Sequence, residues 1–159
     1  KINDFNATVA AFSSIKPEPE TKEVKPLEQL SDAEMLVKDI FRALKTDEAE
    51  ADRLLRDYLA QGHASTTMIF NNLMKHYQKK RDAISGGVET NARMRIYEYF
   101  ALMQTTESAP DTYTFAILVD AAKSVSQAQE YFQTMLDMNV KPNVFVANGV
   151  LQAYSRVEA

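Results

Sequence analysis

The feature that most constrains this chain is a helical spacing of apolar residues, which returns in one segment after another from residue 32 to residue 159. Within each segment the apolar residues follow one another at intervals of three and four, so they lie on one face of an α-helix. No segment alternates apolar and polar residues for long enough to predict a strand. The sequence therefore predicts an all-α fold. The expected buried faces are Val37, Ile40, Phe41 and Leu44; Ala51, Leu54, Leu55 and Tyr58; Phe70, Leu73, Met74 and Tyr77; Ile96, Tyr99, Phe100 and Met103; Phe115, Leu118, Val119 and Ala122; Ala128, Tyr131, Phe132 and Met135; and Ala147, Val150, Leu151 and Tyr154.

The first helix has a clear start signal. Ser31 is followed three residues later by Glu34, which matches a capping box in which each side chain bonds the other residue's backbone N–H. The residues before it carry three prolines among lysine and glutamate. We expect residues 1–31 to form an extended or disordered arm.

The helices fall into pairs that end alike. The last large apolar residue of each second helix, for example Met135, stands seven positions before a short polar or proline-containing ending, here Pro142-Asn143. Such self-similarity predicts stacked helix-turn-helix repeats. The predicted units are 32–66, 67–111, 112–143, and 144–159 as the first helix of a fourth unit. The apolar face of that last helix leads us to expect that the natural chain continues beyond Ala159.

The second unit is longer than the others. Its extra residues fall between its two helices, in the segment 79–90, where Gly86-Gly87 indicates a loop. We therefore expect a long inter-helix turn in this unit.

The third unit carries the most specific sequence. The run 110–121 reads PDTYTFAILVDA, 128–135 reads AQEYFQTM and 139–143 reads NVKPN. These residues resemble a pentatricopeptide repeat. The resemblance extends to 67–111 and 144–159 and is weaker in 32–66. The tetratricopeptide repeat is a related alternative, but the aromatic start of the first helix and the Lys-Pro-Asn ending favour the pentatricopeptide type.

This resemblance implies an α-solenoid in mitochondria or chloroplasts that binds single-stranded RNA and acts in RNA processing, stability or translation. Base reading would fall to a polar residue early in the first helix and to the last residue of the repeat. Asn71 and Asp111 form such a pair, of the kind that the family generally uses for uracil, whereas Ala116 in the third unit has no hydrogen-bonding group. The residues that the resemblance implies are Asn71, Asp111, Asn143 and Asn148 for base reading; Met68, Tyr113 and Phe145 for base stacking; and Lys75, Lys79, Lys80, Arg81 and Arg156 for phosphate contact.

Each of these residues also has a purely structural interpretation. Asp111 and Asn143 follow prolines and precede helices, where both residue types are good N-caps. Met68, Tyr113 and Phe145 could pack between repeats, and the basic segment 79–81 could be a solvated turn.

Composition narrows the function classes. A net charge of −4 does not favour a protein held on nucleic acid by phosphate neutralisation alone. The absence of cysteine excludes disulfides, thiolate metal sites and a cysteine nucleophile. Because the sequence also lacks phosphate-binding, dinucleotide and metalloprotease motifs, we expect a binding module without cofactor or metal rather than an enzyme.

Three partner hypotheses remain open. The first is RNA, and the second is a protein scaffold in an organellar ribosome or another large assembly. The acidic balance and the weak first unit favour the scaffold. The third is a helical appendage of a larger enzyme. Because no segment is long and apolar enough to span a bilayer, we expect no membrane insertion. The visible sequence also shows no targeting peptide.

Overall fold

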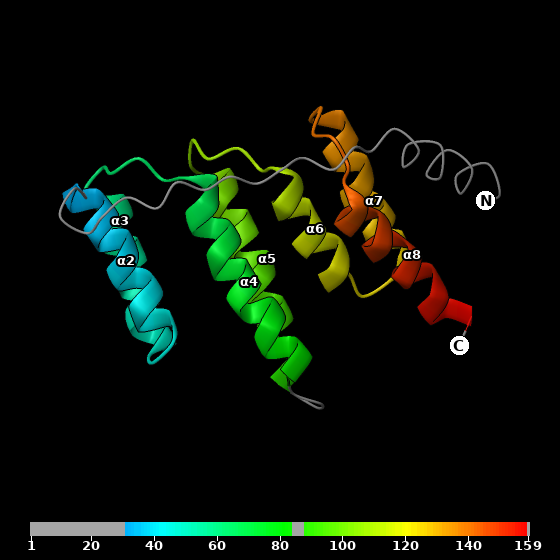
Figure 1. Cartoon of the computed structure of the whole chain (residues 1–159), viewed down its shortest axis with the longest axis horizontal. Helices are drawn as coiled ribbons and strands as arrows, with labels where there is room; N and C mark the ends of the chain where they lie inside the picture. The colour runs from blue at the N-terminus through cyan, green and yellow to red at the C-terminus, as the bar shows by residue number, and fades with distance from the viewer. Residues whose placement is uncertain (1–30, 84–87, 159) are drawn as a thin grey trace. The chain divides into compact units, whose positions relative to one another are not determined.

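The structure is a computed structural model that describes residues 31–83 and 88–158. Every regular element in these ranges is an α-helix, which confirms the all-α prediction. Two compact units divide at Ala109 and Pro110: the N-terminal unit contains α2–α5 and the C-terminal unit contains α6–α8 (Figure 1). The helices are α2 (Asp32–Leu44), α3 (Glu48–Ala60), α4 (Thr67–Ala83), α5 (Val88–Gln104), α6 (Thr112–Ala121), α7 (Val125–Asp137) and α8 (Val144–Glu158). None of the helices described is both long and apolar enough to cross a membrane.

The N-terminal unit consists of two helical hairpins. In the first hairpin α2 packs on α3, in the second α4 packs on α5, and α2 also contacts α4. Figure 1 shows α2 and α4 in one layer, with α3 and α5 behind them. The core between these helices comprises Ile40, Leu44, Ala51, Leu55, Tyr58, Ile69, Phe70, Leu73, Met74, Tyr77, Ala92, Ile96, Tyr99 and Met103. Most of these residues belong to the apolar faces that the sequence predicted.

The C-terminal unit packs α8 against both α6 and α7. A β-carbon added to Gly149 would stand 2.9 Å from Val119 Cγ1, so a glycine here allows α6 and α8 to approach closely. The phenol of Tyr154 is hydrogen-bonded by Gln129 of α7. The core of this unit includes Phe115, Ile117, Leu118, Val119, Ala128, Phe132, Met135, Val146, Ala147 and Val150.

The helix starts that the sequence predicted are confirmed. Ser31 and Glu34 form the capping box of α2, with Ser31 N donating to Glu34 Oε2 at 2.8 Å. Asp111 caps α6 by accepting from Thr114 N at 3.0 Å. Asn143 caps α8 by accepting from Val146 N at 3.0 Å. Capping at Asp111 and Asn143 therefore agrees with their structural interpretation.

Two predictions were wrong in detail. The segment 79–90 is mostly helical, because α4 continues to Ala83 and α5 begins at Val88. The extra length of the second unit therefore lengthens its helices instead of forming a long turn. Leu151 was expected to be buried, but it is 43% exposed, because α8 turns Val146, Val150 and Ala153 toward its neighbours. The predicted arm lies outside the described residues, except Ser31.

Candidate functional site

The exposed face of α4 carries most of the functional residues predicted for the N-terminal unit. Met68, Asn71, Lys75 and Lys79 recur at intervals of three and four, so they form one stripe along the helix. The opposite face of α4 is buried in the core, which fixes the stripe on the surface. Met68 is 55% exposed, Lys75 and Lys79 are exposed and Asn71 is half-buried. Met68 thus lies at the surface instead of packing in the core.

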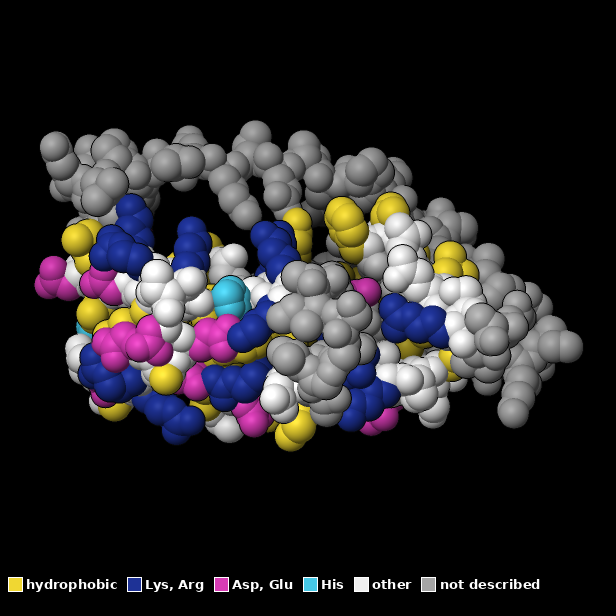
Figure 2. All heavy atoms as spheres, turned by 90° about the horizontal axis from the view of Figure 1, so that it is seen from below, with side chains coloured by type: hydrophobic (Ala, Val, Ile, Leu, Met, Phe, Trp, Pro, Cys, Tyr) yellow, Lys and Arg dark blue, Asp and Glu magenta, His cyan; other side chains and the backbone are white. Residues whose placement is uncertain are grey.

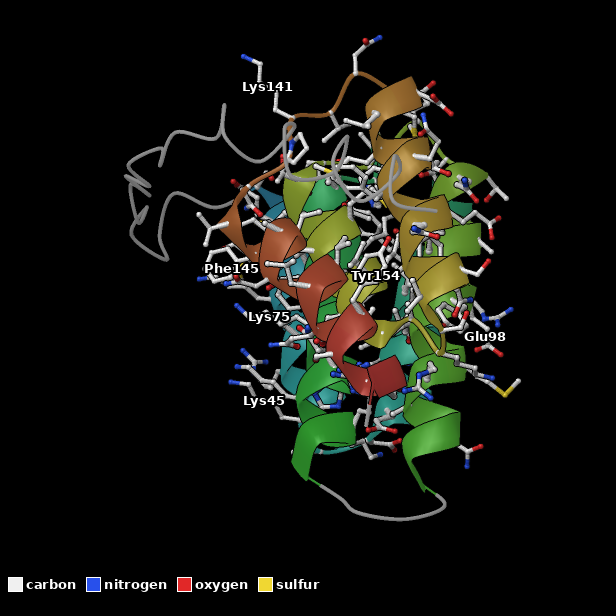
Figure 3. The ribbon with its side chains drawn as sticks, turned by 90° about the vertical axis from the view of Figure 1, so that its right-hand side faces the viewer. Lys45, Lys75, Glu98, Lys141, Phe145 and Tyr154 are labelled. Atoms are coloured by element: carbon white, nitrogen blue, oxygen red, sulfur yellow. The ribbon has the colours of Figure 1, made fainter. Side chains whose placement is uncertain are left out.

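Basic side chains dominate this side of the unit. Figure 3 shows Lys45, at the end of α2, and Lys75 of α4 on the same side, with Glu98 of α5 on the opposite side. Figure 2 views the molecule from the end that carries the α2–α3 turn, and lysine and arginine side chains stand along the upper rim of this unit. The overall acidic charge is therefore distributed unevenly, and a polyanion would approach the side formed by α2 and α4.

Lys80, one of the predicted phosphate contacts, forms an ion pair with a carboxylate. Its Nζ lies 2.7 Å from Glu48 Oε1 at the start of α3, and His76 Nε2 lies 3.0 Å from the same oxygen. Because a carboxylate only accepts hydrogen bonds, the imidazole donates from Nε2. Partial burial alone would raise the pKa of Glu48, but the hydrogen bonds from Lys80 and His76 outweigh it, so this pKa lies below its ordinary value. Lys80 thus forms an ion pair with Glu48. Of the predicted lysines, Lys75 and Lys79 belong to the exposed stripe of α4.

A hollow of about 710 Å³ surrounds this ion pair. Its walls come from the end of α2, the α2–α3 turn, the start of α3 and the end of α4. The sequence did not reveal this cluster, because its two donors are far from Glu48 along the chain: His76 is 28 residues away and Lys80 is 32 residues away. The one available signal was the spacing of His76 and Lys80, which places both on one face of α4. The lining residues are Leu44, Lys45, Thr46, Asp47, Glu48, Ala49, His76, Lys79 and Lys80.

A second polar cluster joins the two hairpins on the other side of the unit. Asp52 of α3 accepts hydrogen bonds from Arg95 and Tyr99 of α5. The guanidinium of Arg95 also lies 5.1 Å from the ring centroid of Tyr99 and 5.6 Å from that of Tyr77. Burial, and then the hydrogen bond to Asp52, raise the pKa of the Tyr99 phenol well above its ordinary value. Because its groups satisfy one another, this cluster serves to hold the hairpins in register.

The C-terminal unit presents the remaining predicted residues. Phe145 of α8 is 66% exposed and Tyr113 of α6 is also exposed. Figure 3 shows Phe145 on the outer side of α8 and Tyr154 on its inner side, toward α7. Asn148 and Arg156 are exposed on α8. Phe145 and Tyr113 are therefore surface side chains and are not part of the buried core.

The structure groups the predicted residues in two sets. In the N-terminal unit, Met68, Asn71, Lys75 and Lys79 share one helix face, while Arg81 is half-buried in the last turn of α4. In the C-terminal unit, the predicted residues lie at the starts of α6 and α8 and along α8. Asn71 and Asp111, the predicted base-reading pair, belong to different units. The helix cap at Asp111 engages one carboxylate oxygen, Oδ1, in the bonds to Thr114.

Comparisons with known proteins found no family model that matches the chain and no curated protein with a similar sequence.

Proposed function

We propose that this chain is a pentatricopeptide-type helical-repeat module that binds single-stranded RNA in an organelle. The stripe on α4 is the observation that carries the proposal. It combines an exposed apolar side chain for base stacking in Met68, an amide for hydrogen bonding in Asn71, and two ammonium groups for phosphates in Lys75 and Lys79. Single-stranded RNA presents a partner for each of these groups: base faces for stacking, base edges for hydrogen bonds and phosphates for the ammonium groups.

The second and third predicted repeats contain equivalent hydrogen bonds, which support the repeat interpretation. Thr67, at the start of α4, donates to the carbonyl of Ala109 at 2.6 Å. Thr112, at the start of α6, donates to the carbonyl of Lys141 at 2.8 Å. Both threonines open a predicted unit, and both carbonyls lie two residues before its final residue. This equivalence favours a solenoid in which each unit is closed by the same local contact.

The residues that follow the second helix of a predicted repeat also share a backbone conformation. Gly62 after α3 and Asn139 after α7 are both in the left-handed region, with φ of 77° and 57°. Each stands four residues before the end of its predicted unit. This repeated ending supports the division into units at residues 66 and 143.

A protein scaffold is the second candidate. Val144, Phe145 and Leu151 give α8 an exposed apolar surface, which suits a protein partner better than a nucleotide chain. In the first predicted unit, Leu36 stands where a polar base-reading residue is expected. If this candidate holds, the chain binds no RNA, and substitutions along α4 leave its partner binding unchanged.

The test measures fluorescence anisotropy of labelled oligouridine and oligoadenosine with the full chain at low salt. We expect oligouridine to bind more tightly and Asn71→Ala to reduce that preference. Asn72→Ala is the matched control, because Asn72 is an exposed asparagine on the same helix with no assigned role. Equal effects of the two variants, at unchanged helicity, would remove Asn71 from the site.

Asp111 requires a variant that keeps the helix cap. Asparagine is as good an N-cap as aspartate, so Asp111→Asn preserves the start of α6 while replacing the carboxylate. We expect altered base preference with unchanged thermal stability. A change in stability alone would leave Asp111 with only its structural role.

A further inference from the structure

The hollow beside Glu48 is lined by more lysine side chains than its carboxylates pair with. Lys45, Lys79 and Lys80 line it from α2 and α4, against the carboxylates of Asp47 and Glu48. Asp47 is engaged in capping α3, where its Oδ1 accepts from Ala49 N at 3.1 Å and from Glu50 N at 3.2 Å. Two of the three ammonium groups thus face the hollow without a carboxylate partner among the described residues.

Glu48 marks where the donors converge. One oxygen, Oε1, accepts from both His76 and Lys80. An anionic oxygen at this point therefore receives two hydrogen bonds from side chains already in place, which is how protein sites bind phosphate oxygens. Lys45 and Lys79 lie on the same hollow and supply charge for further oxygens.

We propose that this hollow binds a terminal phosphate group of the RNA, and that Glu48 competes with it for Lys80 and His76. The inference rests on the proposed RNA function and adds a ligand group, a site and a competitor to it. A terminal phosphate monoester carries nearly two negative charges and three acceptor oxygens at neutral pH. A phosphodiester within the chain carries one charge and two free oxygens. Three lysines and a histidine match the monoester better.

Competition by Glu48 has a specific consequence. Because the pKa of Glu48 lies below its ordinary value, the side chain is a carboxylate at neutral pH. It neutralises Lys80 when the hollow is empty and repels an entering phosphate. Removing this charge therefore strengthens phosphate binding, whereas removing Lys45 weakens it. Opposite effects from two lining residues distinguish a binding site from a merely structural ion pair.

The experiment compares three oligouridines of one sequence, labelled internally, that carry a 5′-phosphate, a 3′-phosphate or neither. With the full chain we expect one phosphorylated form to bind about tenfold more tightly than the unphosphorylated form, the gain of about one charge-assisted hydrogen bond. Lys45→Ala should abolish this preference, so that the three oligonucleotides bind alike. Glu48→Gln should increase the preference. Lys123→Ala, which removes an exposed lysine of the C-terminal unit, is the matched control.

Three outcomes overturn the inference: equal binding of all three oligonucleotides, a preference that persists in Lys45→Ala, or a preference that Glu48→Gln decreases. A second measurement separates this inference from the proposed function. At least one of uridine 5′-monophosphate and uridine 3′-monophosphate, but not uridine, should shift the backbone amide resonances of Thr46 and Glu48 in an NMR titration. If these shifts occur and no oligonucleotide binds, the phosphate site stands and the RNA function fails. If RNA binds without a terminal preference and these shifts are absent, the function stands and the phosphate site fails.

Discussion

Gly149 of α8 lies directly against Val119 of α6, so closely that a β-carbon at position 149 would stand 2.9 Å from Val119 Cγ1. Val119 is buried and belongs to the apolar face that the sequence predicted for α6. This contact explains why a glycine is present in the interior of a helix, where it is otherwise unfavourable.

Replacing Gly149 by alanine tests that contact. Alanine is favoured over glycine within a helix by about 1 kcal/mol, whereas overpacking a core costs about 1–3 kcal/mol. We expect Gly149→Ala to lower the free energy of unfolding by about 1 kcal/mol, measured by urea denaturation. A gain in stability would contradict the close approach of α6 and α8. Asn148→Ala, at an exposed neighbouring position, should cause no loss.

Gly62 and Asn139 should respond to substitution in opposite directions. A β-carbon at Gly62 would meet nothing within 4 Å, so any cost there comes from its positive φ. We expect Gly62→Ala to destabilise the protein by about 1 kcal/mol, and Asn139→Gly to leave stability unchanged or to raise it slightly. Urea unfolding of both variants measures the effect. A loss at Asn139→Gly would argue against a left-handed conformation at that position.

Tyr99 predicts a loss of stability in alkali. Its pKa is raised by burial, so the folded protein holds the phenolic proton more tightly than the unfolded chain does. This contribution is complete below the unfolded pKa of about 10 and is lost as the pH rises above it. Urea unfolding between neutral and alkaline pH should show a shallower decline for Tyr99→Phe than for the unsubstituted protein.

Glu48 predicts the opposite behaviour in acid. Its folded pKa is depressed, so its contribution is present above the ordinary value of 4.5 and is lost as the pH falls through the lower folded pKa. We expect Glu48→Gln to be less stable at neutral pH by at most about 1 kcal/mol, because the ion pair is partly exposed. The difference should shrink as the pH falls below 4.5 and disappear below the folded pKa. Glu107→Gln, at an exposed position, provides the control.

RNA affinity should be modest and dependent on salt. Few exposed cations lie along the α4 stripe, and the net charge of the chain is −4. At physiological salt we expect dissociation constants of about a micromolar or weaker, with binding that strengthens steeply at lower salt. Anisotropy titrations at several salt concentrations measure both properties. A nanomolar constant at physiological salt would show that other parts of the surface contribute to binding.

The sequence alone determined the helices, most of their buried faces and the caps at Ser31, Asp111 and Asn143. These features depend on residues a few positions apart, because helical periodicity and capping hydrogen bonds act within one or two turns. The residues of the α4 stripe were expected only from the resemblance to a repeat family, but their position on the surface also follows locally, because Phe70, Leu73 and Tyr77 bury the opposite face of the helix.

Only the tertiary structure decided which side chains from different helices meet. The contact of Glu48 with His76 and Lys80, the cluster of Asp52 with Arg95 and Tyr99, and the exposure of Leu151 depend on how helices distant in sequence pack together. The periodicity within one helix carries no information about how that helix is placed against another. For the same reason the local sequence did not show that Lys80 of α4 forms an ion pair with Glu48 of α3.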